Sequence, residues 1–489
     1  MAPGSTPGST PGSAWPWAAV ASDVPRAAHA GTQAIAACQA ERLARLLQAA
    51  LGTRHYGELL RGLDPARVAL TSLPVSSKPQ LMQQFAERVT DPLIRLDDLR
   101  AFCADPQRIG QPFLERYVVW ESSGSTGQPG VFVQDEAAMA VYDALEATRR
   151  HSPRPLVRLF DPLFLSERLA FVGALGGHFA SPVSVRRLQT VNPWLAMRSR
   201  SFSIMQETAA LVEALNGFQP SILATYPTAA VLLAEQAQRG ALRIRPQEVW
   251  TGGETLSAPM RARIEQAFGC ALRNSYGASE FLPIAWECEH GQLHVNADWV
   301  MLEAVDAQHR PVPAGQVSHT TLLTNLANHV QPLIRFDIGD CITFGIAPCR
   351  CGSALPTVQV QGRRDDVLVE HDRHGARVSM LPLALTTLLE DEAGVFDFQL
   401  CQRAPGHWCL TLGPGAPHTA AARERCRGLL ADFARLQGAT KLRIDTRVAD
   451  TLPLGRSGKC KRIVGLAAAA AAEPPRAGTR VRKPRTTTS

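Results

Sequence analysis

The stretch Glu121-Ser-Ser-Gly-Ser-Thr-Gly-Gln-Pro-Gly130 lies between two short runs of β-branched and aromatic residues, 117–120 and 131–134. Its small residues let the backbone turn tightly, so that N–H groups and hydroxyls converge on one anion. The stretch is neither a Walker A motif, which ends in Gly-Lys-Ser/Thr, nor a GxGxxG turn. We interpret it as a phosphate-binding loop, although a plain Ser/Gly hairpin would have the same composition. The loop residues assigned to phosphate are Ser122, Ser123, Gly124, Ser125, Thr126 and Gly127.

Outward from this loop, strand-like and helical runs alternate as far as residue 324, which predicts an α/β fold of layered sheets and helices. The strand-like runs are 117–120, 131–134, 221–224 and 248–251, and the helical runs are 137–149, 229–238 and 257–268. A helical segment, 31–85, precedes them. Beyond Gly362 the pattern changes to helix 382–391, strands 395–402 and 407–412, helix 418–436 and strand 441–447, typical of a separate α+β domain.

These patterns predict a large N-terminal domain, residues 31–362, and a small, mobile C-terminal domain, residues 363–465. We expect both ends of the chain to be disordered. Residues 1–30 contain a Pro/Gly/Ser repeat, and residues 466–489 form a basic tail, compositions that do not build a packed core.

The composition of the 489-residue chain excludes several classes of protein. Apolar residues make up 45% and charged residues 19%, as in folded globular proteins. The sequence has no apolar run long enough to span a membrane. Of the net charge of +7, the tail 470–489 supplies +4, because it holds five basic residues and one Glu, so a specific nucleic-acid partner is not expected. The eleven cysteines, without a secretion signal, indicate reduced thiols and a cytoplasmic protein.

Six sequence blocks, in order, resemble those of the adenylate-forming (AMP-binding) acyl/aryl-CoA ligases. Within that superfamily they are most similar to the phenylacetate-CoA ligase and coenzyme F390 synthetase branch. One departure is Gln128, where the family often has lysine. The blocks are SSGSTGQPG at 122–130, TGGE at 251–254, SYGASE at 275–280, TNL at 324–326 with PLIRFDIGD at 332–340, GRRDD at 362–366, and GRSGK at 455–459.

The resemblance implies two catalytic residues. Attack of a carboxylate on the α-phosphate of ATP builds negative charge, so positioned positive charge and a metal are needed. Lys459 matches the family's catalytic lysine, and it is one of five lysines among 51 basic residues. Glu280 is similar to the family's magnesium-binding glutamate, and a carboxylate suits Mg²⁺. A solvated lysine and an exposed glutamate at a helix N-terminus are the structural alternatives.

The same blocks imply a nucleotide site. Tyr276 resembles the aromatic residue that stacks on adenine, and Asp340 the aspartate that accepts both ribose hydroxyls. Arg363 would add a second ribose contact; otherwise Asp340 and Arg363 form a structural pair. Asp365 matches the hinge about which the small domain turns, or it is a polar linker residue. Residues that would border the nucleotide and acyl pocket are Gly252, Gly253, Glu254, Gly277 and Ser279.

A cysteine cluster suggests a second kind of site. Cys349 and Cys351 form a CxC pair, and Cys288 lies upstream with His290 and His294. Two separated pairs of ligands can hold a tetrahedral Zn²⁺, although from the spacing alone buried thiols are equally acceptable. Some members of the branch that the chain resembles carry a structural zinc, which favours Cys288, His294, Cys349 and Cys351, with His290 as the rival histidine.

The sequence therefore predicts a ligase that uses ATP and Mg²⁺ to adenylate a small, aromatic carboxylic acid and passes the acyl group to a thiol. Coenzyme A is the first choice of acceptor by resemblance, and the phosphopantetheine thiol of an acyl carrier protein is the second. Two alternatives stay open. The chain could nucleotidylate a cofactor, as F390 synthetase does, or be an inactive, zinc-stapled nucleotide-binding scaffold.

Overall fold

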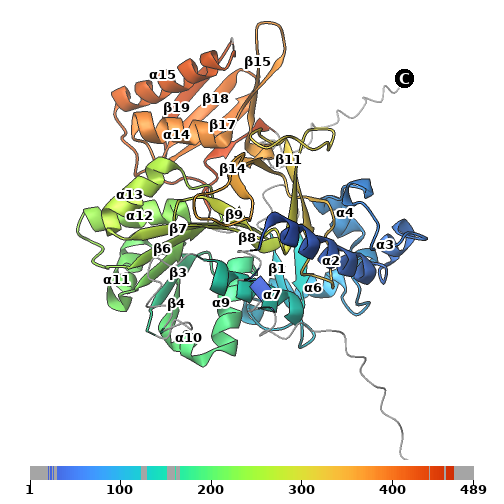
Figure 1. Ribbon diagram of the computed structural model, residues 1–489. Helices are drawn as coiled ribbons and strands as arrows, with labels where there is room; N and C mark the ends of the chain where they lie inside the picture. Colours follow the sequence, from blue (N-terminus) through green and yellow to red (C-terminus); the bar gives the residue numbers. More distant parts are fainter. Residues whose placement is uncertain are drawn as a thin grey trace, which may run out of the picture.

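The computed structural model describes residues 20, 23–24, 26, 30–122, 129–150, 160, 166–439, 441–455 and 459–466. The chain forms a large body, on which a smaller unit of sheet and helices stands (Figure 1). The predicted α/β class with a second, smaller α+β unit is confirmed. Residues 123–128 of the phosphate loop, most of the N-terminal extension and nearly all of the basic tail lie outside the described residues.

A nine-stranded sheet forms the centre of the large body, in the order β13-β14-β9-β8-β7-β6-β5-β3-β4. The strands from β4 to β7 in this order are parallel, and those from β7 to β13 are antiparallel. The parallel strands need crossover connections, which helices supply. The strands are β3 (Leu169–Gly173), β4 (Ser199–Ser203), β5 (Ile222–Thr225), β6 (Glu248–Gly252), β7 (Ala271–Ala278), β8 (Phe281–Glu287), β9 (Leu293–Val295), β13 (Asp340–Phe344) and β14 (Thr357–Arg363).

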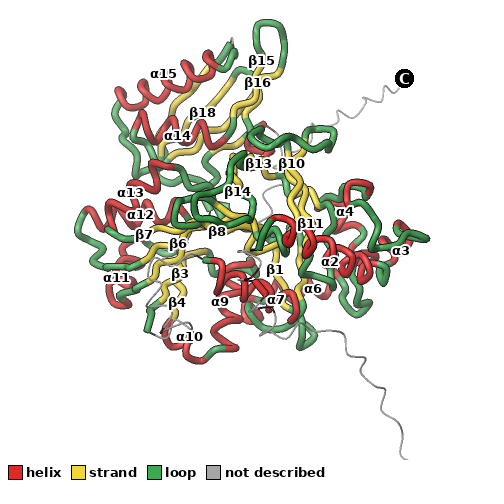
Figure 2. The backbone as a smooth tube through the Cα atoms, in the orientation of Figure 1, coloured by secondary structure: helices red, strands yellow, loops and turns green. Residues whose placement is uncertain are grey.

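Alternate side chains of the parallel strands face two different layers. Val172 and Leu223 belong to a buried cluster with residues of α11, α12 and α13, whereas Phe171 and Ala224 face a cavity that α7 and α9 also line. Figure 2 shows the helices packed around the strands of this sheet. The helices are α7 (Glu136–Arg149), α9 (Ala180–Val191), α10 (Pro193–Arg198), α11 (Thr208–Phe218), α12 (Pro227–Gln238) and α13 (Ala258–Phe268).

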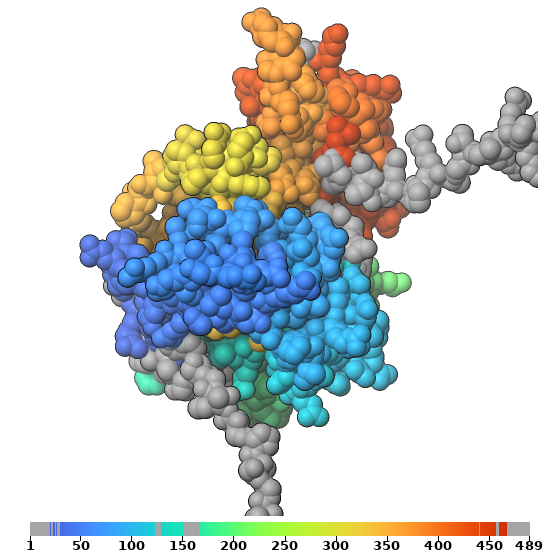
Figure 3. All heavy atoms as spheres, turned by 90° about the vertical axis from the view of Figure 1, so that its right-hand side faces the viewer, coloured from blue at the N-terminus to red at the C-terminus, as the bar shows by residue number. Residues whose placement is uncertain are grey.

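Two smaller sheets and the N-terminal helices complete the large body. Strands β1 (Val118–Glu121) and β2 (Val131–Gln134) pair on either side of the phosphate loop, and Trp120 Nε1 donates a hydrogen bond of 2.8 Å to the Ser279 carbonyl. The N-terminal helices gather on one face (Figure 3). The remaining elements are α2 (Thr32–Ala50), α3 (Arg54–Leu59), α4 (Lys78–Gln83), α5 (Phe85–Arg88), α6 (Leu96–Ala104), β10 (Val300–Val305), β11 (Thr320–Asn325), β12 (Phe336–Asp337) and short 3₁₀ turns at Leu70–Ser72 and Pro106–Arg108.

The small unit has its own hydrophobic core, whose buried members run from Leu368 to Ile463. Its main sheet has the order β19-β18-β17-β20, and the last strand returns beside β17 in parallel. The elements are a 3₁₀ turn (Arg364–Asp366), β15 (Leu368–His371), β16 (Arg377–Met380), α14 (Pro382–Ala393), β17 (Phe398–Ala404), β18 (His407–Leu412), α15 (Ala420–Leu436), β19 (Arg443–Val448) and β20 (Ile463–Val464).

The sequence located α7, α12, α13, α14 and α15 and the parallel strands β5 and β6 within a few residues. It did not predict β3, β4, the helices α9 to α11 or the antiparallel half of the central sheet. Strand β7 continues to Ala278, and only Ser279 and Glu280 connect it to β8. Neither of these two connecting residues is a glycine or a proline, the residues that usually mark a tight turn in a sequence. All eleven cysteines are unpaired. Among the described helices, none combines the length and apolarity needed to cross a membrane.

Candidate active site

A cavity of about 1690 Å³ lies at the carboxyl ends of the parallel strands and extends to the small unit. In open α/β sheets, ligands bind in this position. Most of the predicted site residues that the structure describes line the cavity; Asp365 does not, although its neighbour Asp366 does. The predicted residues that line it are Ser122, Gly252, Gly253, Glu254, Tyr276, Gly277, Ser279, Glu280, Asp340, Arg363 and Lys459.

The phosphate loop is closed at its base by two hydrogen bonds. Ser122 N donates to the Gly130 carbonyl and Gly130 N donates to Ser122 Oγ, each at 2.8 Å. The hydroxyl of Ser122 therefore accepts a hydrogen bond that holds the ends of the loop together. The other predicted phosphate ligands, Ser123, Gly124, Ser125, Thr126 and Gly127, lie outside the described residues, as does Gln128.

Tyr276, Asp340 and Arg363 form one hydrogen-bonded group. Tyr276 donates its hydroxyl to Asp340 Oδ2 at 2.7 Å, and Arg363 Nη1 donates to Oδ1 at 3.0 Å. The pairing of β13 with β14 places Asp340 directly opposite Arg363. Burial, together with the Asp340 charge, raises the pKa of Tyr276 well above its ordinary value. A carboxylate has about four lone-pair sites, so Asp340 keeps acceptor capacity for a ligand.

Glu280 lies in the two-residue connection between β7 and β8, not at a helix N-terminus. The connection is close: a Cβ on Gly277 would lie 2.0 Å from the Leu282 carbonyl oxygen, so only glycine fits there. Burial raises the pKa of the Glu280 carboxyl, and the Lys78 ammonium opposes that shift. A buried carboxylate in such surroundings is stabilised by a cation.

Lys78 is a cavity residue that the sequence analysis did not single out. It begins α4, and its Cδ lies 3.4 Å from where a Cβ on Gly130 would be, beside the phosphate loop. Its place in the helical N-terminal segment, far along the chain from the other blocks, gave no sign of this position. The one feature of the sequence that could have drawn attention to Lys78 is that the chain has only five lysines among its 51 basic residues.

Lys459 comes from the small unit and reaches into the large body. Its ammonium lies 5.2 Å from the centre of the Tyr226 ring, and a Cβ on Gly253 would lie 2.7 Å from its Nζ. Gly253 also has φ +77°, a backbone conformation that favours glycine. Burial lowers the pKa of Lys459, and the carboxylate of Glu254 opposes this effect.

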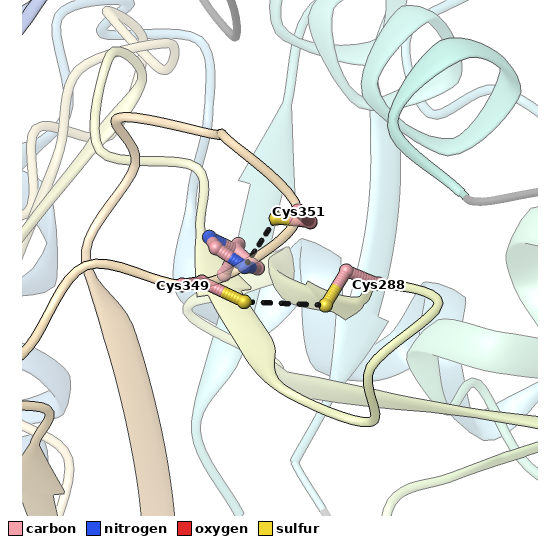
Figure 4. A group of neighbouring side chains, drawn as sticks. Cys288, Cys349 and Cys351 are labelled. Carbon is pink, nitrogen blue, oxygen red and sulfur yellow. Dashed lines mark hydrogen bonds between the residues drawn. The ribbon is translucent and has the colours of Figure 1, made fainter.

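Four of the predicted metal ligands converge at the edge of the central sheet (Figure 4). The ligand atoms of Cys288, His294, Cys349 and Cys351 all lie within 4.8 Å of one another. His290 is not among them; its side chain is 45% exposed. The Cys288 and Cys349 sulfurs are 3.8 Å apart, and Cys351 Sγ is 3.3 Å from His294 Nε2.

The arrangement fits a tetrahedral zinc ion. Zn–S bonds of ~2.3 Å at a tetrahedral angle would separate two sulfurs by about 3.8 Å. The Leu355 carbonyl lies 2.9 Å from Nδ1 of His294, which orients the ring so that Nε2 faces the sulfurs. Three thiols and one imidazole are a donor set for zinc, and with four protein ligands the ion would have no open position for a reacting water.

Comparison with known proteins supports the fold. No family model matches the chain. Protein CapK of Staphylococcus aureus is 29% identical over 133 residues, a stretch that covers 27% of this chain and only 28% of CapK. Among solved structures, 2-hydroxyisobutyryl-CoA ligase in its postadenylation state, in complex with 2-HIB-AMP, has a TM-score of 0.65 at 19% identity, over 90% of this chain and 91% of that one.

The same ligase in its thioesterification state, with 2-HIB-AMP and CoA, gives a TM-score of 0.52 over the same shares of the two chains. The anthranilate CoA ligase AuaEII, in complex with anthranoyl-AMP, has a TM-score of 0.50 at 16% identity, over 70% of this chain and 65% of that one. The chain therefore has the fold of these CoA ligases, with a large and a small unit.

We expect the purified protein to contain about one zinc ion per chain, and Cys349→Ser to lose most of it because a hydroxyl is a poor zinc ligand. Metal content by mass spectrometry measures this directly. Cys38→Ser, on α2 and outside the cluster, is the matched control and should keep the metal. Zinc-free wild-type protein with an unchanged melting temperature after zinc is added would contradict the site.

Proposed function

We propose that the chain is an ATP- and Mg²⁺-dependent ligase that adenylates a carboxylic acid and transfers the acyl group to a thiol, with CoA as the first choice. The observation that carries this proposal is the position of Lys459. A lysine from the small unit lies against Gly253 at the carboxyl end of the parallel strands, in the same cavity as Asp340 and Glu280. In this proposal Lys459 supplies a mobile positive charge, Asp340 a carboxylate for the ribose and Glu280 a carboxylate for the metal.

In the proposed adenylation step, the carboxylate of the acid attacks the α-phosphate of ATP and pyrophosphate leaves. Lys459 stabilises the charge on the α-phosphate oxygens, and the loop 122–127 holds the β- and γ-phosphates with the aid of Lys78. Asp340 and Arg363 bind the ribose, and Tyr276 packs against the adenine. Mg²⁺, held by Glu280, would neutralise charge on the phosphates.

The walls of the cavity support an aromatic acid. Beyond the predicted nucleotide site, the cavity is lined by Phe171 on β3, Phe179 before α9, Tyr226 before α12 and Trp250 on β6. Flat aromatic side chains of this kind favour stacked or edge-to-face packing with a ring. The anthranilate CoA ligase named above also acts on an aromatic acid, which is consistent with this proposal.

The second half-reaction requires the small unit to move. In the present arrangement the Lys459 side chain lines the cavity. We propose that the small domain, 363–465, turns about Asp365 to admit the thiol while the large domain, 31–362, stays fixed. The higher TM-score against the postadenylation state than against the thioesterification state supports the view that the present arrangement is the adenylating one. Such domain motions let one pocket serve two steps.

Three parts of this proposal rest mainly on the sequence resemblance. The first is membership of the phenylacetate-CoA ligase and F390 synthetase branch, which the order of the six blocks favours. The second is the cytoplasmic location, and the third is CoA, rather than a carrier-protein thiol, as the acceptor. The four clustered ligands Cys288, His294, Cys349 and Cys351 would have a structural role, tying the β8–β9 connection to the segment before β14.

ATP–pyrophosphate exchange over a panel of aryl and fatty acids, with and without CoA, tests the function. We expect acid-dependent exchange, strongest with an aromatic acid, and thioester formation when CoA is added. A stable AMP adduct that persists with abundant CoA would favour cofactor nucleotidylation instead. No exchange with any acid, in protein that binds ATP and retains its metal, would favour an inactive scaffold.

Lys459→Ala should lower the rate of adenylation by about 10²–10³-fold, because one positioned charge on the transition state is lost. The transfer of a supplied acyl-adenylate to CoA should change little, since Lys459 has left the cavity by then. Lys441→Ala, an exposed lysine of the same unit, is the control. Equal loss of both half-reactions would contradict the role of Lys459.

Asp340→Asn should weaken ATP binding about tenfold, because a charged acceptor for the ribose is replaced by a neutral amide and the ion pair with Arg363 is lost. Isothermal titration with ATP measures the change, and the exposed Asp445→Asn is the control. Unchanged ATP affinity in a folded Asp340→Asn protein would rule out Asp340 as a nucleotide ligand.

A further inference from the structure

A buried polar cluster joins the small unit to the large body, and none of its three residues has a role in the nucleotide site proposed above. It consists of Ser257 at the start of α13, Glu390 on α14 and Arg462 just before β20, which are 2%, 2% and 9% exposed. We call it the interdomain cluster. Ser257 belongs to the large body, whereas Glu390 and Arg462 belong to the small unit. Polar groups this deeply buried require partners, and here they are one another's partners.

Each oxygen of the Glu390 carboxylate has a separate partner. Ser257 donates its hydroxyl to Oε2, and Arg462 Nη1 forms an ion pair with Oε1. The same Ser257 hydroxyl oxygen accepts a hydrogen bond of 3.2 Å from Met260 N, which caps α13. Arg462 Nη2 donates to Met260 Sδ at 3.4 Å, a second contact across the boundary. Two residues of α13 therefore hold the pair from the small unit.

Arg462 lies three residues after Lys459 on a segment that is fixed at several points. The Arg462 carbonyl accepts a hydrogen bond of 2.7 Å from Leu400 N, and Lys461 Nζ lies 2.5 Å from Asp366. Gly455 N donates to the Lys459 carbonyl at 2.9 Å. The Arg462 side chain is therefore one of several points that fix the segment next to Lys459.

We infer that Glu390 is a positioning residue for adenylation. Through Arg462 it fixes the segment that carries Lys459, and through Ser257 it fastens that segment to α13. The contact with Ser257 exists only while the small unit keeps its present orientation, so the cluster favours the adenylating arrangement and must open before the acyl group is transferred. This inference rests on the proposed function.

The test compares Ser257→Ala and Glu390→Gln with the wild-type protein in the two half-reactions. We expect each variant to lower adenylation, measured by ATP–pyrophosphate exchange, by about tenfold, the effect of losing one or two buried hydrogen bonds. Transfer from a supplied acyl-adenylate to CoA should stay the same or become faster, because the cluster no longer opposes the movement. Glu265→Gln is the control, since Glu265 lies on α13 in a part-exposed pair with Arg261.

A purely structural role would lower both half-reactions together, and that result would overturn the inference, as would no change in either. Hydrogen exchange supplies a readout that needs no activity. We expect the backbone amide hydrogens of residues 459–464 to exchange faster in Glu390→Gln than in the wild type. Those in the core of the large body should exchange at the same rate in both proteins. If the wild-type protein shows no acid-dependent ATP–pyrophosphate exchange, that result counts against the proposed function alone. The positioning role would be excluded separately if residues 459–464 of Glu390→Gln and of the wild type had equal rates of amide hydrogen exchange.

Discussion

The Lys459 side chain of the small unit extends to the carboxyl ends of the parallel strands in the large body, and the other groups of the cavity lie around its ammonium. The ammonium fits against the backbone because Gly253 has no Cβ and adopts φ +77°. A Cβ at that position would lie 2.7 Å from the Lys459 Nζ, so the lysine would have to shift. The charge is kept in a half-buried place, where burial lowers the pKa of Lys459 and the carboxylate of Glu254 raises it.

The rest of the large body places oxygen and aromatic groups around that cation. The parallel strands end together, which brings Thr251 and Tyr276 to one edge, and the antiparallel continuation of the sheet brings Asp340 and Arg363 opposite each other. The three clustered cysteines and His294 bring together the end of β8, strand β9 and the segment before β14. A single sheet, half parallel and half antiparallel, therefore supplies both the crevice and the groups that border it.

Sequence blocks that resemble those of a known family picked out Tyr276, Asp340 and Lys459, and the structure brings these residues to one cavity. The same resemblance favoured His294 over His290 beside the three cysteines, and the structure places the His294 side chain with them. The sequence did not reveal Lys78 or the contact between Ser257 and Glu390, because these groups meet across distances of more than a hundred residues and carry no motif. It also missed the antiparallel half of the sheet, since β7 and β8 are joined by two residues without a glycine or proline.

The proposed function requires Lys459 of the small unit to contact the α-phosphate of a nucleotide bound in the large body. A crystal structure with a non-hydrolysable acyl-adenylate analogue would show this contact. We expect the Lys459 ammonium within hydrogen-bonding distance of the phosphoryl oxygens, with the ribose on Asp340. An analogue bound elsewhere, or a Lys459 side chain that stays between Gly253 and Tyr226 with the phosphate out of reach, would contradict it.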